Sequence, residues 1–146
     1  DPDRICAVGA SYGGYAALME VVRNPDLYQC VISMAGVTDV AYLLSRYRFS
    51  STYEIVRKQL GTRRSELRKR SPLHNSESID VPVLIAHGTA DFSVGVEHSR
   101  RMFDELEDAG KDVTYLEFED GDHNLSKHEH RLEFLTAMDE FLREHL

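Results

Sequence analysis

The feature that most constrains the fold is a five-residue segment, Gly9 to Gly13 (GASYG), with two very different neighbours. Residues 4–8 before it are mostly apolar, as in a buried strand, and residues 12–23 after it have a helical pattern rich in small side chains. A strand that becomes a helix over so few residues must bend sharply. Glycine on both sides of Ser11 predicts that bend, because side chains there would collide. The segment therefore predicts a strand–turn–helix unit with Ser11 exposed at its tip.

The rest of the chain continues the alternation of strands and helices. Further apolar runs predict strands at residues 30–35, 83–87 and 113–118. Helices are predicted at residues 94–109 and after residue 126, while residues 38–80 are too long for a simple crossover and predict a helical excursion. Such alternation favours parallel pairing. We therefore predict an α/β chain: a partial α/β-hydrolase fold of about four parallel strands, with helices on both faces and the excursion after the second strand.

The sequence also predicts four local features. The helix at residues 94–109 has an apolar face and Gly110 at its end, and Ser126 to Glu129 form a predicted capping box for the last helix. The inner face of that last helix is expected to carry Leu132, Leu135, Met138 and Leu142. Cys6 and Cys30 have no C-x-x-C spacing and are interpreted as small buried thiols.

Composition excludes several classes of function. The chain has 146 residues, one domain by length, and a net charge of −8, which argues against nucleic-acid binding. No segment approaches 18 consecutive apolar residues, so no membrane span is expected. The histidines show no spacing typical of a metal site, and neither a metal nor a cofactor is expected.

Ser11 is the candidate nucleophile. At the tip of such a turn its hydroxyl is exposed, and the backbone N–H of Tyr12 points to where an oxyanion would form. Serine needs a base, and the base needs an orienting acid; in this fold they follow in the order serine, acid, histidine. Asp91 follows the third predicted strand and His123 follows the fourth, at the sheet edge where open α/β sheets bind ligands.

Other interpretations of these residues remain open at this stage. The segment at Ser11 could be a tight turn with an unreactive serine, and Asp91 could cap the helix that follows it. Asp39, after the second strand, is the competing acid. His87 closes the third strand and is interpreted as a structural histidine beside Gly88.

Several motifs in register resemble the prolyl oligopeptidase family, which includes dipeptidyl and acylaminoacyl peptidases. Residues 1–17 resemble its nucleophile region, and three further motifs follow in the same order: residues 71–75 (SPLHN), 87–91 (HGTAD) and 121–123 (GDH). The resemblance implies a serine peptidase acting on oligopeptides, with Ser11 as nucleophile, His123 as base and acid, and Asp91 orienting His123. It also implies an oxyanion donor at Tyr12 and a substrate-pocket residue at Val94.

The same resemblance implies that much of the enzyme lies outside these residues. Family members carry a β-propeller and the first half of the hydrolase sheet upstream, so residues 1–146 are expected to be the C-terminal portion of a catalytic domain, with the excursion at about 38–80. The first strand would then have an exposed apolar edge and could self-associate. We expect weak activity from this portion alone and leave its compartment open. A carboxylesterase or lipase of the same fold, and a non-catalytic association module, are the alternatives.

Overall fold

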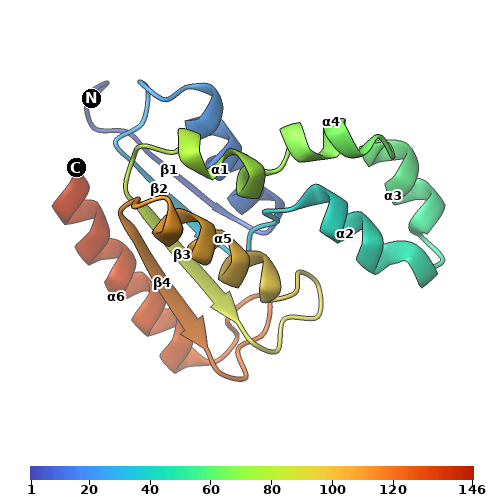
Figure 1. Cartoon of the computed structure of the whole chain (residues 1–146). Helices are drawn as coiled ribbons and strands as arrows, with labels where there is room; N and C mark the ends of the chain where they lie inside the picture. The colour runs from blue at the N-terminus through green and yellow to red at the C-terminus, as the bar shows by residue number, and fades with distance from the viewer.

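A computed structural model describes residues 1–146 and shows one parallel sheet with strand order β1-β2-β3-β4 (Figure 1). The strands are β1 (Cys6–Ala10), β2 (Cys30–Met34), β3 (Val83–Gly88) and β4 (Val113–Phe118). The α-helices are α1 (Tyr12–Arg23), α2 (Val40–Arg46), α3 (Tyr53–Leu60), α4 (Arg64–Lys69), α5 (Glu97–Asp108) and α6 (His128–His145). Two short 3₁₀ helices complete the chain, η1 (Tyr47–Phe49) and η2 (Pro72–Ser78). Four parallel strands with helices on both faces confirm the predicted fold class.

The core has two layers because alternate strand residues point to opposite faces of the sheet. Val31, Val83 and Ile85 pack on one face against α1 and α5, while Ile32 and Leu84 pack on the other face against α6. Figure 1 shows α6 alone on its side of the sheet. The middle strands are thus covered on both faces, which explains why their sequences are apolar without alternation.

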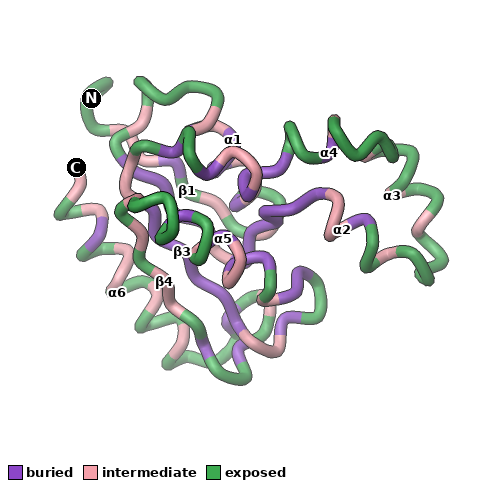
Figure 2. The backbone as a smooth tube through the Cα atoms, in the orientation of Figure 1, coloured by how far each residue is buried: buried purple, intermediate pink, exposed green.

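Between β2 and β3 the chain forms a helical arm, made of α2, η1, α3 and α4, that projects from the sheet (Figure 2). Its own small core consists of Val40, Leu44 and Leu67, with half-buried apolar side chains around it. The tip is open to solvent, and Phe49 there is 97% exposed. The arm is therefore held mainly at its base, where α2 follows the second strand.

The last helix differs from its sequence prediction at two points. Its N-cap is Lys127 with no side-chain cap, so the predicted capping box at Ser126 does not form. Of the four predicted inner residues, Met138 and Leu142 pack against the sheet as expected, whereas Leu132 and Leu135 are more than half exposed. Phe134 and Phe141 complete the face that covers the sheet. The inner face is therefore rotated from the predicted one, and contact with the sheet selects it.

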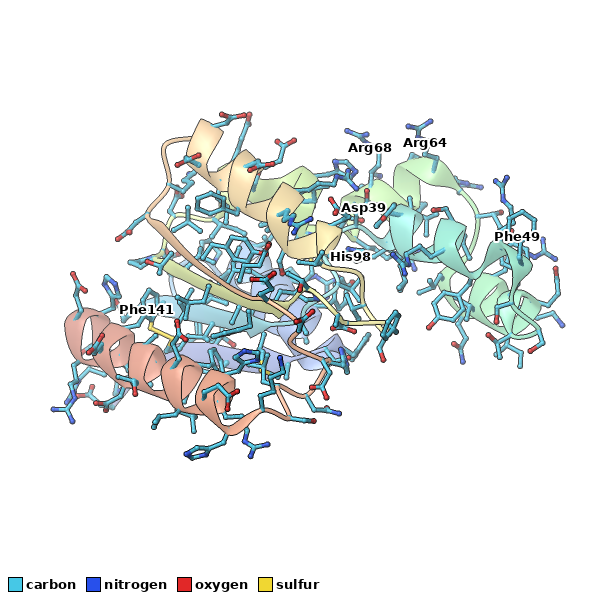
Figure 3. The ribbon with its side chains drawn as sticks, turned by 90° about the horizontal axis from the view of Figure 1, so that it is seen from below. Asp39, Phe49, Arg64, Arg68, His98 and Phe141 are labelled. Carbon is cyan, nitrogen blue, oxygen red and sulfur yellow. A yellow bond between two sulfur atoms is a disulfide. The ribbon has the colours of Figure 1, made fainter.

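The two cysteines form a disulfide, which corrects the prediction of free thiols. Cys6 and Cys30 are directly paired in the register of β1 and β2, with Cα atoms 4.6 Å apart, a separation that a disulfide can span. Figure 3 shows the bond beside Phe141 of α6. The spacing of 24 residues carries no hint of this pairing, because it arises from the strand register.

β1 lies at one edge of the sheet and pairs only with β2. Its side chain Val8 is 53% exposed, in contrast to the buried strands β2 and β3. The strand therefore presents both a free edge and an apolar side chain to solvent.

No helix in the structure combines the length and apolarity needed to cross a bilayer.

A charged network ties the start of α5 to β4. Arg100 donates to both carboxylate oxygens of Glu117 at 2.8 and 2.7 Å and also contacts Glu97 at 3.0 Å, while the Tyr115 hydroxyl donates to Glu117 at 2.6 Å. The hydrogen bonds from Arg100 lower the pKa of Glu117 from its ordinary value of 4.5 to about 2. A bidentate pair of this kind holds both partners in fixed geometry.

This network predicts acid-dependent stability. Because the pKa of Glu117 is lowered by folding, the ionised carboxylate stabilises the fold above pH 4.5, and this contribution fades as the pH falls toward 2. We expect Glu117→Gln to cost about 1 kcal/mol at neutral pH, given the partial exposure of the pair, and to cost little near pH 2. Thermal unfolding across this range measures the difference. Glu54→Gln, in the exposed pair with Arg57, is the control, and an equal effect from it would contradict the prediction.

Candidate active site

Ser11 occupies the sharp turn between β1 and α1. Its backbone has φ 56° and ψ −121°, a conformation that non-glycine residues rarely adopt, and its N–H donates to the Met34 carbonyl at 2.9 Å. The turn therefore lies directly over the end of β2. Tyr12 is the first residue of α1, so its backbone N–H has no carbonyl partner within the helix. The serine hydroxyl and a free N–H donor are therefore on adjacent residues.

Close backbone packing explains the glycines around this turn, with one correction. A side chain at Gly9 would overlap the carbonyl of Gly13, and one at Gly14 would lie 2.7 Å from the Ser33 hydroxyl. A side chain at Gly13 would meet nothing within 4 Å. The prediction that both flanking glycines avoid collisions is therefore right for Gly9 and wrong for Gly13.

Backbone strain is concentrated at one edge of the sheet. Four non-glycine residues have positive φ angles: Ser11, Ala35, Asp120 and Leu125. They follow β1, β2 and β4, so all lie in the loops at the carboxyl ends of the strands. Strain of this kind persists only where the surrounding structure fixes it, and it is typical of functional sites.

Asp91 is anchored on the loop after β3, and its side chain is fully buried. Its Oδ1 accepts the backbone N–H groups of Ser93 and Val94 at 2.8 and 2.9 Å, while its Oδ2 lies 2.6 Å from His123 Nδ1. The N-cap of α5 is Val96, so Asp91 does not cap that helix. The carboxylate is instead held by its own loop and directed at the histidine.

His123 lies on the loop after β4, and its side chain is 22% exposed. An ionised carboxylate only accepts hydrogen bonds, so His123 Nδ1 carries the proton toward Asp91, which leaves Nε2 free to accept one. Ser11 makes no side-chain hydrogen bond, with His123 or with any other residue. The structure therefore brings the predicted acid and base into contact and places the predicted nucleophile at the same edge, without joining it to them.

Two glycines bring the loops of Asp91 and His123 together. A side chain at Gly88 would overlap the Gly121 carbonyl, and that same carbonyl accepts the N–H of Ala90 at 2.9 Å. Beyond them, Asp122 accepts the N–H of Ser126 at 2.8 Å, and hydrogen bonds from Ser126 lower the pKa of Asp122. Asp122 thus shapes the His123 loop and is not a second acid beside His123.

Asp39, the competing acid, has a different role. Its Oδ1 accepts the N–H groups of Ala41 and Tyr42 at the start of α2, and its Oδ2 lies 3.1 Å from Arg101. Figure 3 shows Asp39 close to His98 of α5, whose Nδ1 accepts the backbone N–H groups of Thr38 and Asp39. Burial lowers the pKa of His98 to about 4, so the ring is neutral and available as that acceptor.

Sequence reasoning missed a second histidine at the site. His87 is fully buried and contacts Ser99, Asp91 and the Val94 carbonyl, although the sequence indicated only a structural residue beside Gly88. Ser99 and its neighbour His98 are the buried polar residues of α5. The only sequence signal was a pair of polar residues at positions where the helix packs inward.

An apolar cavity of about 270 Å³ opens next to the turn at Ser11. Its eight lining residues are Tyr12, Tyr15, Val37, Val40, Leu43, Gln59, Leu60 and Arg70. They come from α1, from α2 and α3 of the arm, and from the residues after β2 and α4. Val94, the predicted pocket residue, is buried and does not line this cavity.

Comparison with known proteins shows the family of the chain. The sequence profile described as the prolyl oligopeptidase family matches residues 1–146. The chain belongs to the prolyl oligopeptidase family. This family membership makes it a relative of serine peptidases with the α/β-hydrolase fold, in agreement with the motifs of the sequence.

Its relatives in the prolyl oligopeptidase family are much longer proteins. Dipeptidyl aminopeptidase BIII of Pseudoxanthomonas mexicana is 30% identical over 96% of this chain, and dipeptidyl peptidase 4 of Sus scrofa is 29% identical over 99%. Acylaminoacyl peptidase of Pyrococcus horikoshii superposes over the whole chain with a TM-score of 0.86 at 27% identity. The chain spans 21% and 18% of the two curated relatives and 24% of the solved structure.

The contrast between Gly9 and Gly13 gives a direct test of the turn. Gly9→Ala is expected to lower the free energy of unfolding by about 1–3 kcal/mol, because the new methyl group overlaps the Gly13 carbonyl. Gly13→Ala has open space, and alanine favours the helix, so we expect no loss and up to about 1 kcal/mol of gain. Urea denaturation of both variants measures this difference, and equal destabilisation would contradict the packing described above.

Proposed function

We propose that the chain carries the catalytic triad of a serine peptidase, with Ser11 as nucleophile, His123 as general base and acid, and Asp91 as its orienting carboxylate. The observation that carries the proposal is the 2.6 Å contact between His123 Nδ1 and the buried carboxylate of Asp91. It fixes the tautomer that leaves Nε2 able to accept a proton. The strained turn at Ser11 lies at the same edge of the sheet and presents the hydroxyl beside the free N–H of Tyr12.

The reaction follows from these positions. His123 Nε2 takes the hydroxyl proton as Ser11 Oγ bonds to the scissile carbonyl carbon, and the resulting oxyanion accepts the Tyr12 N–H. His123 then returns that proton to the leaving amine, and the peptide C–N bond breaks to leave an acyl-serine. Water, deprotonated by His123, hydrolyses the acyl-serine and restores the enzyme. Asp91 remains ionised throughout and stabilises the transient imidazolium.

The apolar cavity supports a peptide substrate with an apolar side chain next to the scissile bond. Tyr12 lines the cavity and follows Ser11 directly, so a side chain held there lies close to the reacting carbonyl. Val94 donates its N–H to Asp91, and we keep its assignment to the substrate pocket as a proposal that rests on the family resemblance. Specificity for the length or the ends of the peptide is assigned to groups outside residues 1–146.

We also propose that these residues are the C-terminal portion of a longer catalytic domain. The supporting observations are the free edge of β1, the exposed Val8 and relatives about four to five times as long. Pairing of that edge with the first half of a hydrolase sheet would cover it, and a β-propeller would lie further upstream. Without such a partner the edge favours self-association.

Covalent labelling tests the triad. In the full-length protein we expect a fluorophosphonate to label Ser11, and Ser11→Ala to abolish both labelling and hydrolysis of a peptide amide. Asp91→Asn is expected to lower kcat about 10⁴-fold, because the wrong histidine tautomer is then favoured. Mass spectrometry of the labelled peptide identifies the site, and Ser45→Ala on the exposed face of α2 is the control. A folded protein that remains unlabelled would sink the proposal.

The choice of substrate separates a peptidase from an esterase. We expect the protein to cleave peptide amides. The kcat/KM for this cleavage is expected to fall in Ser11→Ala, and to fall when a larger side chain is introduced into the cavity. Activity confined to short acyl esters would indicate the carboxylesterase alternative, and tight partner binding by an unreactive protein would indicate an association module.

If residues 1–146 are only part of the catalytic domain, they should be less active alone than within the full-length protein. Residues 1–146 alone are expected to turn over substrate at least about 10²- to 10³-fold more slowly than the full-length protein, since Tyr12 is the one oxyanion donor identified among them. Steady-state kinetics on one peptide amide gives the ratio, with circular dichroism to establish that both proteins are folded. Equal kcat values would show that these residues are sufficient.

A further inference from the structure

His87 makes three polar contacts inside the fold and takes no part in the proposed reaction. The residue is the last but one of β3, and its ring is completely buried. Its Nδ1 lies 2.6 Å from the Ser99 hydroxyl, and its Nε2 lies 2.9 Å from the Val94 carbonyl and 3.2 Å from Asp91 Oδ2. A buried histidine with a partner at each nitrogen is held in one orientation.

These partners determine the protonation of the ring. The Val94 carbonyl and the Asp91 carboxylate can only accept, so Nε2 carries a proton and donates to both of them. Burial lowers the pKa of His87, which keeps the ring neutral, so Nδ1 has a free lone pair. The Ser99 hydroxyl therefore donates to Nδ1, and this bond selects the Nε2–H tautomer.

Asp91 and Val94 are thereby held from two sides. Asp91 Oδ2 accepts two imidazole donors, His87 and His123, while Oδ1 accepts two backbone donors. Val94 donates its N–H to Asp91 and accepts from His87 through its carbonyl. Removing the His87 donor would leave the buried Val94 carbonyl without this partner and Asp91 Oδ2 bound by His123 alone.

We propose that His87 is a positioning residue that, oriented by Ser99, fixes the carboxylate of Asp91 and the backbone of Val94 relative to each other. It acts through Asp91 and touches no reacting atom. The backbone donors hold Oδ1, and the second donor at Oδ2, from β3, further restricts the direction in which the carboxylate holds the base. Ser99 connects this arrangement to α5, so the acid is braced by the sheet and by a helix as well as by its own loop.

The inference rests on the triad proposed above, and two variants at position 87 separate positioning from packing. In the full-length protein, His87→Phe keeps a ring but removes the donor, and His87→Gln keeps an N–H donor at a similar distance from the backbone. We expect His87→Phe to lower kcat and the rate of fluorophosphonate labelling of Ser11 by about 10- to 100-fold, as for a lost hydrogen bond to a charged group. If His87→Phe lowers these rates about 100-fold, His87→Gln is expected to react at least about tenfold faster than His87→Phe, because its amide restores that bond.

A matched histidine and a second measurement complete the experiment. His130 of α6 stacks on Phe118, and its buried Nδ1 has no partner, so His130→Phe is expected to leave both rates within twofold of the unsubstituted protein. Nitrogen-15 NMR of the imidazoles should show His87 with Nε2 protonated and Nδ1 unprotonated. Ser99→Ala should shift the Nδ1 resonance. The NMR measurement of the His87 tautomer in the unsubstituted protein tests the proposed orientation of the ring even if a His87 variant does not fold.

The outcomes separate the two proposals. Unchanged rates in His87→Phe, no rescue by His87→Gln, or a ring protonated at Nδ1 would each overturn the positioning role while leaving the triad in place. Failure of the unsubstituted protein to be labelled would overturn the triad, and the role of His87 with it.

Discussion

The carboxylate of Asp91 is the interaction on which the rest of the site depends. It is fully buried, where an unpaired charge would be strongly unfavourable, and four N–H groups satisfy its two oxygens. Two of these donors are backbone N–H groups of its own loop, one is His87 near the end of β3, and one is His123. The loops after β3 and β4 thus meet at one charge, and each group that stabilises it also restricts the direction in which it can act.

The sheet supplies the place where this can happen. Four parallel strands in sequential order end at the same edge, so the loops that follow β1, β3 and β4 converge without long connections. Hydrogen bonds from Ser11 to Met34 and from Thr89 to Phe118 extend the ladder beyond the strand ends and hold the loops close to it. Close contact of Gly88 with Gly121 then sets the spacing of the acid and base loops. The four residues with positive φ lie in the same region, where this packing fixes them.

Sequence reasoning succeeded where a local pattern has a local cause. The alternation of apolar runs and helical segments predicted a parallel α/β sheet, and the limits of α1 and β4 matched the pattern residue for residue. It failed where two patterns compete or where contacts are distant. The apolar residues of the last helix cover more than one face, and only packing on β2 and β3 selects the face with Phe141. The disulfide of Cys6 and Cys30 depends on strand register, which neither cysteine's neighbours reveal.

By itself, the sequence determined the fold class, the turn at Ser11 and the order in which Ser11, Asp91 and His123 follow their strands. Each of these depends on residues that are neighbours along the chain, where glycine, apolar runs and strand ends have direct steric consequences. Only the tertiary structure decided that Asp91 contacts His123 and does not cap α5, that the apolar cavity is lined by α1 and by helices of the arm, and that His87 and Ser99 brace the acid. Those contacts join β3, α5 and the loop after β4, and they exist only once the sheet has brought these elements together.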